Sequence, residues 1–222
     1  MAATSAESQR EQRLAMVNSQ LRTGDVVDRE VLAAFLETPR ERFVAPDFTA
    51  LAYLDREIPA RGARTRRLLP PLTLARMLQA VAVKAGDRAL DVGGGSGYGA
   101  ALLELMGAKV VALESDAGAA AAAREELTGR PNIEVVEGPV DAGAAPLGPF
   151  EVIVVEGAFR ICPKGLLSQL ANGGRLVGID ASGGSSQAAL YERRGEGLSR
   201  RALFETTAHT LDGFQPSVSF TF

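Results

Sequence analysis

The sequence predicts an α/β protein built on a doubly wound, mostly parallel sheet. From residue 84 onward, short apolar segments alternate with segments of helical period, a pattern typical of a parallel sheet covered on both faces. The runs 110–113 and 152–155 are continuously apolar, as strands buried on both faces require. A glycine-rich turn at 93–97 joins a short apolar strand to a helix. Such turns occur beside ligand crevices in sheets of this kind.

The part of the chain before this alternation is predicted to be helical. Residues 1–13 are small, polar or charged without an apolar period, so we expect a disordered tail. Apolar residues then recur at helical spacing between 14 and 36, and again over 72–83. Residues 14–83 should therefore form N-terminal helices and a loop on the substrate side.

The alternating part should form the core of a single domain over 14–222. Residues 84–180 supply the parallel strands and their helices, whereas 181–222 carry recurring charged and small polar residues that indicate antiparallel edge strands. The expected core strands are 88–92, 109–114, 133–137, 150–155 and 175–179, with helices over 98–106, 117–127 and 165–171.

Composition narrows the classes of function. The chain has 222 residues and a formal net charge of −3, which argues against a general nucleic-acid binder. Its apolar runs are shorter than the roughly 20 residues of a membrane span, and charged residues stand where a signal sequence would have an apolar core. We therefore expect a cytoplasmic protein that does not bind membranes.

Histidine and cysteine are too scarce for several kinds of site. Cys162 is the only cysteine and His209 the only histidine. No metal site is expected from them, and a nucleophile–histidine triad is disfavoured because His209 lies in an alternating segment near the end of the chain.

The glycine turn is the strongest candidate site. Gly95, Gly97 and Ala100 match a dinucleotide fingerprint, but that motif would begin well beyond the end of the strand. The spacing Gly93-x-Gly95-x-Gly97, with Asp91 immediately before it, fits the strand boundary better. An NAD-dependent dehydrogenase is thus the weaker alternative.

Two carboxylates flank this turn at the ends of consecutive strands. Asp91 can hold an ammonium group, and Glu114 can accept hydrogen bonds from both hydroxyls of a ribose. S-adenosylmethionine carries both groups, with its adenine expected near 138–140. Otherwise Asp91 would only cap the loop and Glu114 would be a solvated strand end. The residues expected to bind the cofactor are Asp91, Gly93, Gly94, Gly95, Ser96, Gly97, Tyr98, Glu114, Ser115, Gly138, Pro139 and Val140.

Several ordered segments resemble the protein-L-isoaspartate O-methyltransferase family between about residues 14 and 180. They are Met16-Val17-x-x-Gln20-Leu21, Asp28-x-x-Val31-Leu32, Pro39-Arg40-x-x-Phe43-Val44, Ala52-Tyr53-Leu54-Asp55, Asp91-Val92-Gly93-Gly94-Gly95-Ser96-Gly97-Tyr98 and Gln169-Leu170-x-x-Gly173-Gly174-Arg175-Leu176-Val177. The resemblance implies the Rossmann-like fold of class I S-adenosylmethionine-dependent methyltransferases. It also implies methylation of the side-chain carboxyl of an isoaspartyl residue in a damaged protein or peptide.

The sequence departs from this family on the acceptor side. The family's Thr-Ile-Ser-Gln-Pro-Tyr segment is absent, Leu69 stands at the serine position, and Thr65 is the nearest hydroxyl; the catalytic residue is therefore left unassigned. The family's Thr-Ala-Ala becomes Glu156-Gly157-Ala158, where a carboxylate would repel an acceptor carboxylate. Pro139 replaces the family's adenine-side aspartate, which leaves Glu137 or Asp141 as the acidic residue that could accept from the adenine amino group.

The residues expected on the substrate side are Arg64, Thr65, Arg66, Leu69, Glu156 and Phe159. The arginine-rich loop 61–67 is either a solvated connection or a cationic rim for an anionic acceptor. Two further hypotheses follow from the departures. The chain could methylate a different small anionic acceptor, or it could be a non-enzymatic member that binds a partner or senses the cofactor.

Overall fold

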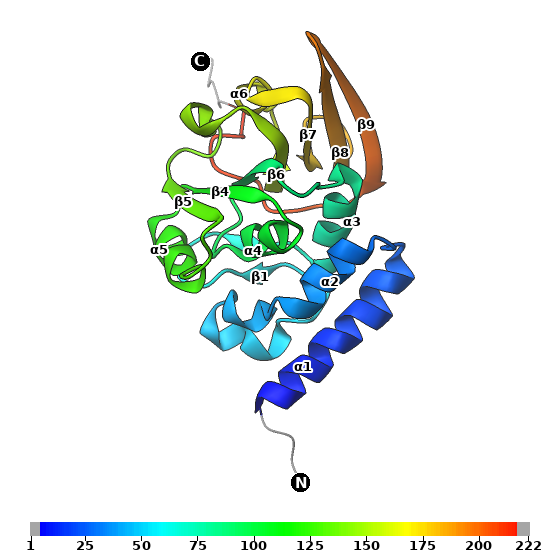
Figure 1. The fold of residues 1–222 in the computed structure, drawn as a ribbon, viewed down its shortest axis with the longest axis vertical. Helices are drawn as coiled ribbons and strands as arrows, with labels where there is room; N and C mark the ends of the chain where they lie inside the picture. Colours follow the sequence, from blue (N-terminus) through cyan, green and yellow to red (C-terminus); the bar gives the residue numbers. More distant parts are fainter. Residues whose placement is uncertain (1–4, 217–222) are drawn as a thin grey trace, which may run out of the picture.

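A computed structural model describes residues 5–216 and centres on a seven-stranded sheet (Figure 1). The strand order is β5-β4-β3-β6-β7-β8-β9, with the first five parallel and β8 and β9 antiparallel. The strands are β3 (Arg88–Val92), β4 (Lys109–Glu114), β5 (Ile133–Glu137), β6 (Phe150–Phe159), β7 (Leu170–Asp180), β8 (Gln187–Arg194) and β9 (Gly197–Glu205). The predicted Rossmann-like sheet with antiparallel edge strands is confirmed; the tail 217–222 lies outside the described residues.

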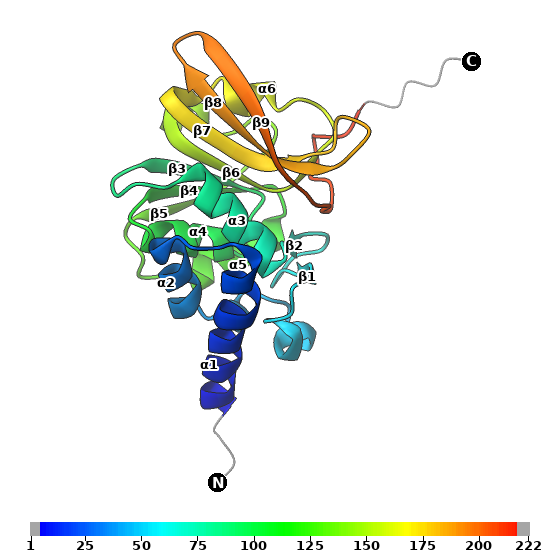
Figure 2. The same cartoon turned by 90° about the vertical axis from the view of Figure 1, so that its right-hand side faces the viewer.

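One face of the sheet carries helices α3 (Pro71–Val81), α4 (Tyr98–Leu105) and α5 (Ala117–Glu126). Outside them lies an N-terminal layer of α1 (Ser5–Met16), the π-helical turn η1 (Val17–Leu21), the 3-10 turn η2 (Arg22–Gly24) and α2 (Arg29–Glu37). The carboxylate of Asp28 caps α2 by accepting from the amides of Glu30 and Val31, a strong start signal. Figure 2 shows α1 extending away from the sheet.

The tail expected over 1–13 is wrong from Ser5 onward, because residues 5–16 form α1. Most of this helix is exposed, so it has no apolar period for sequence analysis to detect. Alanine, glutamate, glutamine and arginine are strong helix formers, and the buried Met16 and Val17 fix its end to the core.

The other face of the sheet is covered mainly by irregular chain. The connection after β5 contains only the 3-10 turn η5 (Ala145–Leu147), and the next contains α6 (Lys164–Leu167). Leu211 and Phe214 pack on the same face. The helix expected over 165–171 is shorter because the chain enters β7 at Leu170.

A small hairpin lies over the carboxyl ends of the central strands. β1 (Ile58–Pro59) pairs antiparallel with β2 (Arg67–Leu68), following the 3-10 turns η3 (Arg40–Arg42) and η4 (Pro46–Leu51). We call residues 60–66, which join the two strands, the strap. Within residues 5–216 no helix has both the length and the apolar character needed to span a bilayer.

Candidate active site

The parallel sheet brings the predicted cofactor segments together at its carboxyl edge. The amide of Gly93 donates to the carbonyl of Leu113 (2.9 Å), and the amide of Gly138 donates to that of Glu114 (3.0 Å). Gly93, Gly95 and Gly97 all have positive φ, at 71°, 66° and 93°, which other residues adopt only with strain. The glycine turn, the end of β4 and the 138–140 loop therefore share one edge.

Glu114 is a buried carboxylate whose position is fixed by backbone donors. Its Oε2 accepts from the amide of Gly95 (3.0 Å), and its Oε1 accepts from those of Ser115 (2.7 Å) and Asp116 (2.9 Å). Glu114 is thus held at the crevice rather than solvated at a strand end, since it is only 2 % exposed.

Arg66 occupies the outer side of this carboxylate. Its Nε donates to Glu114 Oε1 (2.8 Å) and its Nη2 to Ser115 Oγ (2.7 Å), with Asp212 3.5 Å away. The guanidinium is buried, and the cavity beside Glu114 has a volume of only about 10 Å³. In this conformation Arg66 covers the Glu114 carboxylate.

The strap that carries Arg66 is anchored to α5. The amide of Arg64 donates to the Asp116 carboxylate (2.9 Å), and Arg61 forms ion pairs with Glu125 (3.1 Å) and Glu126. Opening the crevice therefore needs movement of the Arg66 side chain or release of these contacts.

A second buried carboxyl group, that of Glu156, lies beside Asp91. The two residues are 0 % and 1 % exposed, and within residues 5–216 none of the four oxygens has a side-chain hydrogen-bond partner outside the pair; the amide of Ala100 also acts on Asp91. A Cβ on Gly99 would lie 1.5 Å from Glu156 Oε1 and 3.5 Å from Asp91 Oδ1, and a Cβ on Gly94 would lie 2.4 Å from Asp91 Oδ2. The two carboxyl groups therefore fill space that these glycines leave free.

A buried arginine accompanies the pair. Arg40 donates from Nε to the carbonyl of Ala52 (2.8 Å) and from Nη2 to that of Leu69 (2.8 Å), while its Nη1 finds no acceptor within residues 5–216. Its guanidinium carbon lies 4.9 Å from the centre of the Tyr98 ring. Arg40 thus brings a positive charge near Glu156.

Burial governs the protonation of the carboxyl pair. Desolvation raises the pKa of Glu156 to about 7, although a hydrogen bond to Asp91 and the charge of Arg40 act against the rise. Burial, followed by repulsion from Glu156, raises the pKa of Asp91 well above its usual range. Two adjacent buried carboxylates oppose each other's ionisation, which adds to the effect of burial on Asp91.

This pair should make stability depend on pH. Between the ordinary Glu156 pKa of 4.5 and its folded value of about 7, the folded protein binds a proton that the unfolded chain has released. Its contribution to the free energy of unfolding therefore falls as pH rises through that window. We expect urea denaturation at about pH 5 and about pH 7.5 to show a larger loss for the wild type than for Glu156→Gln. Equal losses, with exposed Glu134→Gln as control, would contradict this assignment.

Two of the residues expected at the cofactor point into the N-terminal layer instead. The Ser96 hydroxyl donates to the carbonyl of Phe43. The Tyr98 ring packs against Phe35 and Phe43, with ring centres 5.9 and 5.5 Å apart. Their backbone, rather than their side chains, lines the turn.

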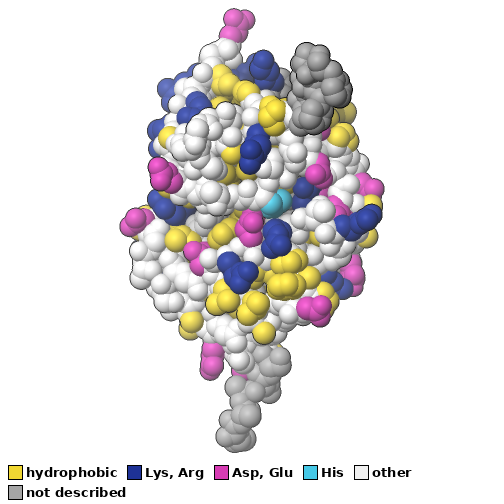
Figure 3. Space-filling view, turned by 180° about the vertical axis from the view of Figure 1, so that it is seen from behind, with side chains coloured by type: hydrophobic (Ala, Val, Ile, Leu, Met, Phe, Trp, Pro, Cys, Tyr) yellow, Lys and Arg dark blue, Asp and Glu magenta, His cyan; other side chains and the backbone are white. Residues whose placement is uncertain are grey.

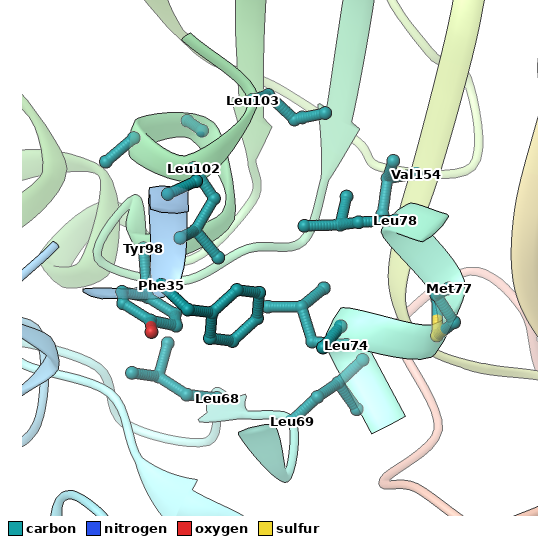
Figure 4. Packing of buried hydrophobic residues seen from close by; sticks show 14 of the residues in the cluster. Phe35, Leu68, Leu69, Leu74, Met77, Leu78, Tyr98, Leu102, Leu103 and Val154 are labelled. Atoms are coloured by element: carbon teal, nitrogen blue, oxygen red, sulfur yellow. The ribbon is translucent and has the colours of Figure 1, made fainter. Parts of the chain in front are cut away.

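The residues expected on the substrate side divide into two groups. Arg64 and Thr65 are exposed on the strap. The other four are buried: Leu69 lies in the core with Leu68 and Leu74 (Figure 4), Phe159 packs on Tyr191 and Phe214, and Arg66 and Glu156 have the contacts described above. Glu156 therefore faces Asp91 and not an open acceptor site.

Sequence reasoning missed Arg40 and Gly99 as parts of this cluster. In the sequence, Arg40 stands out only as a member of the Pro39-Arg40 motif. Gly99 is a glycine inside a helical pattern, which is only a weak sign that another group packs closely against the helix.

His209 lies apart from this cluster and pairs with Glu57 (2.9 Å). Figure 3 shows this imidazole on the face opposite Figure 1, where acidic and basic side chains are interspersed.

Comparison with known proteins gives the family. The family model described as protein-L-isoaspartate(D-aspartate) O-methyltransferase matches residues 11–209. The chain belongs to this family. A protein-L-isoaspartate O-methyltransferase of Koribacter versatilis is 38% identical over 195 residues, which cover 87% of this chain and 86% of that protein. One from Aeropyrum pernix is 42% identical over 178 residues, which cover 78% of this chain and 68% of that protein.

Solved structures of isoaspartyl methyltransferases share the fold. A putative family enzyme from Plasmodium falciparum, in complex with S-adenosyl-L-homocysteine, superposes with a TM-score of 0.76 at 20% identity, covering 89% of this chain and 97% of that one. Another protein-L-isoaspartate O-methyltransferase superposes with a TM-score of 0.78 at 23% identity. The match covers 92% of this chain and 66% of that one. The shared fold therefore spans the helical layer as well as the sheet.

Proposed function

We propose that the protein is an S-adenosylmethionine-dependent methyltransferase acting on the side-chain carboxyl of isoaspartyl residues in proteins or peptides. Family membership supports the activity. The observation that carries the cofactor assignment is the pair of buried carboxylates, Asp91 and Glu114, on either side of the glycine turn. The cytoplasmic location expected from the sequence stays a prediction.

The chemistry of the site suits this cofactor. Asp91 would hold its ammonium group, Glu114 its ribose hydroxyls, and the 138–140 loop its adenine. When bound, the cofactor supplies an electrophilic sulfonium methyl group. An acceptor carboxylate is already a nucleophile, so the residues of the chain need mainly to align the two groups and to exclude water.

The fit requires one rearrangement. The Asp91 oxygens are buried and have no positively charged partner within residues 5–216, which suits a cationic ligand, but Glu114 already binds Arg66 (2.8 Å). The cavity of about 10 Å³ is smaller than a nucleoside. Arg66 must therefore leave Glu114 before the ribose can reach it.

Replacing Arg66 should thus strengthen cofactor binding. In Arg66→Ala the ribose no longer competes with a guanidinium, and we expect calorimetric titration to show roughly tenfold tighter binding of S-adenosylhomocysteine, equivalent to about 1.4 kcal/mol. Exposed Arg64→Ala, on the same strap, should bind like the wild type. Weaker binding in Arg66→Ala would instead indicate that Arg66 contacts the ligand directly.

Methyl transfer tests the proposed acceptor. The enzyme is incubated with tritiated S-adenosylmethionine and two peptides of identical sequence, one with an isoaspartyl and one with an aspartyl residue. We expect base-labile label only on the isoaspartyl peptide. Cofactor binding without label on either peptide would favour a different acceptor or a binding role, which the loss of the family hydroxyl at Leu69 also allows.

A further inference from the structure

Glu156 has no part in the function proposed so far, yet its position is tightly defined. It follows Val155, which pairs with Val92 at the end of β3. Here β6 shifts its register against β7 between Val154 and Ala158. The shift lets the Glu156 side chain turn inward, where Gly99 lacks the Cβ that would lie 1.5 Å from Oε1.

This placement makes Glu156 a partner of Asp91. Glu156 Oε1 and Asp91 Oδ1 both lie within 3.5 Å of the same point, where the Gly99 Cβ would be. Two ionised carboxylates give each other no hydrogen-bond donor, whereas one carboxylic acid can donate to one carboxylate. The only mutual hydrogen bond open to them therefore requires a proton between them.

The groups around the pair do not supply that proton. Glu114, from β4, is an acceptor bound to Arg66. Arg40, from η3, remains a cation, and burial raises the pKa of Tyr98, on α4, which keeps its phenol neutral. The charge of Asp55 acts on Arg40, and the charge of Arg13 acts on Tyr98. Asp91 and Glu156 are thus the groups among these that change protonation near neutral pH.

We propose that Asp91 and Glu156 work as one acid pair, which holds a single proton in the free protein and releases it when Asp91 takes up the ammonium group of the cofactor. The proposal rests on the proposed function, because Asp91 must be the ammonium ligand. A bound cation offsets the second negative charge, so the pair becomes fully ionised. The balance is one ammonium bound and one proton released to the buffer, with no bond to carbon made or broken.

In this scheme Glu156 is a positioning residue. It does not touch the reacting atoms but sets the charge that Asp91 presents to the ligand. Cofactor affinity should then rise with pH as the pair loses its proton unaided.

The test is calorimetric titration of the full-length protein with S-adenosylhomocysteine in two buffers of different ionisation enthalpy, phosphate and imidazole. The difference in observed heat gives the number of protons released. We expect close to one per ligand at about pH 6 and close to none at about pH 8. Methylthioadenosine, which has the nucleoside without the amino acid, should bind without releasing a proton.

Variants locate the proton. Glu156→Gln, a neutral side chain of similar shape, should bind S-adenosylhomocysteine with little proton release, while exposed Glu134→Gln should behave as the wild type. Binding without proton release at about pH 6 would overturn the acid pair alone, as would release that persists in Glu156→Gln or with methylthioadenosine. Failure of S-adenosylhomocysteine to bind at all would overturn the proposed function and the pair together.

Discussion

Gly99→Ala is expected to destabilise the protein by about 1–3 kcal/mol, the usual cost of overpacking a buried site. In a helix the same change normally stabilises by up to about 1 kcal/mol, because glycine loses more backbone freedom on folding. The reversal arises from Glu156, whose Oε1 lies 1.5 Å from the position of the new Cβ. Urea denaturation gives the free energy of unfolding.

The double mutant isolates this contact. In a Glu156→Ala background the carboxyl is gone, so Gly99→Ala should recover its ordinary stabilising sign. If Gly99→Ala stabilised the wild type, or destabilised both backgrounds equally, the buried position of Glu156 would be wrong.

Glu114→Gln is expected to weaken S-adenosylhomocysteine binding about 100-fold, the largest effect on the cofactor. The amide cannot accept two charge-assisted hydrogen bonds from ribose hydroxyls, and their loss is worth about 3 kcal/mol. The variant is best made on Arg66→Ala, because removing Glu114 alone leaves the buried Arg66 without its partner.

The matched control is Glu134→Gln in the same Arg66→Ala background. Glu134 lies on the neighbouring strand β5, pairs in register with Val111 of β4, and is exposed. Calorimetric titration should show unchanged affinity in this control. Equal binding by the Glu114 and Glu134 variants would remove Glu114 from the cofactor site.

Sequence reasoning reached the fold because the relevant signals are local. Continuous apolar runs identify β4 and β6 as buried strands, and parallel order then brings Asp91 and Glu114 to the same edge. The glycine turn is visible for the same reason, since its positive φ values are a local requirement. These features depend on segments only a few residues long.

The acceptor side depends on contacts between distant segments, which no local pattern reveals. Arg66 meets Glu114 across 48 positions of the chain, and its spacing fits a solvated basic loop equally well. From the sequence alone, Glu156 is expected to face the acceptor, because charged residues are rarely buried. Its inward position follows from the register shift in β6 and from the missing side chain of Gly99, and neither has meaning until the sheet is assembled.

The central claim is that the crevice between Asp91 and Glu114, where Arg66 now covers the Glu114 carboxylate, is the cofactor site. A crystal structure of the protein with S-adenosylhomocysteine tests it most directly. We expect the ribose hydroxyls within hydrogen-bonding distance of Glu114, the ammonium group at Asp91, and Arg66 displaced from its carboxylate partner. A bound ligand elsewhere, with the 2.8 Å contact between Arg66 and Glu114 intact, would contradict the account.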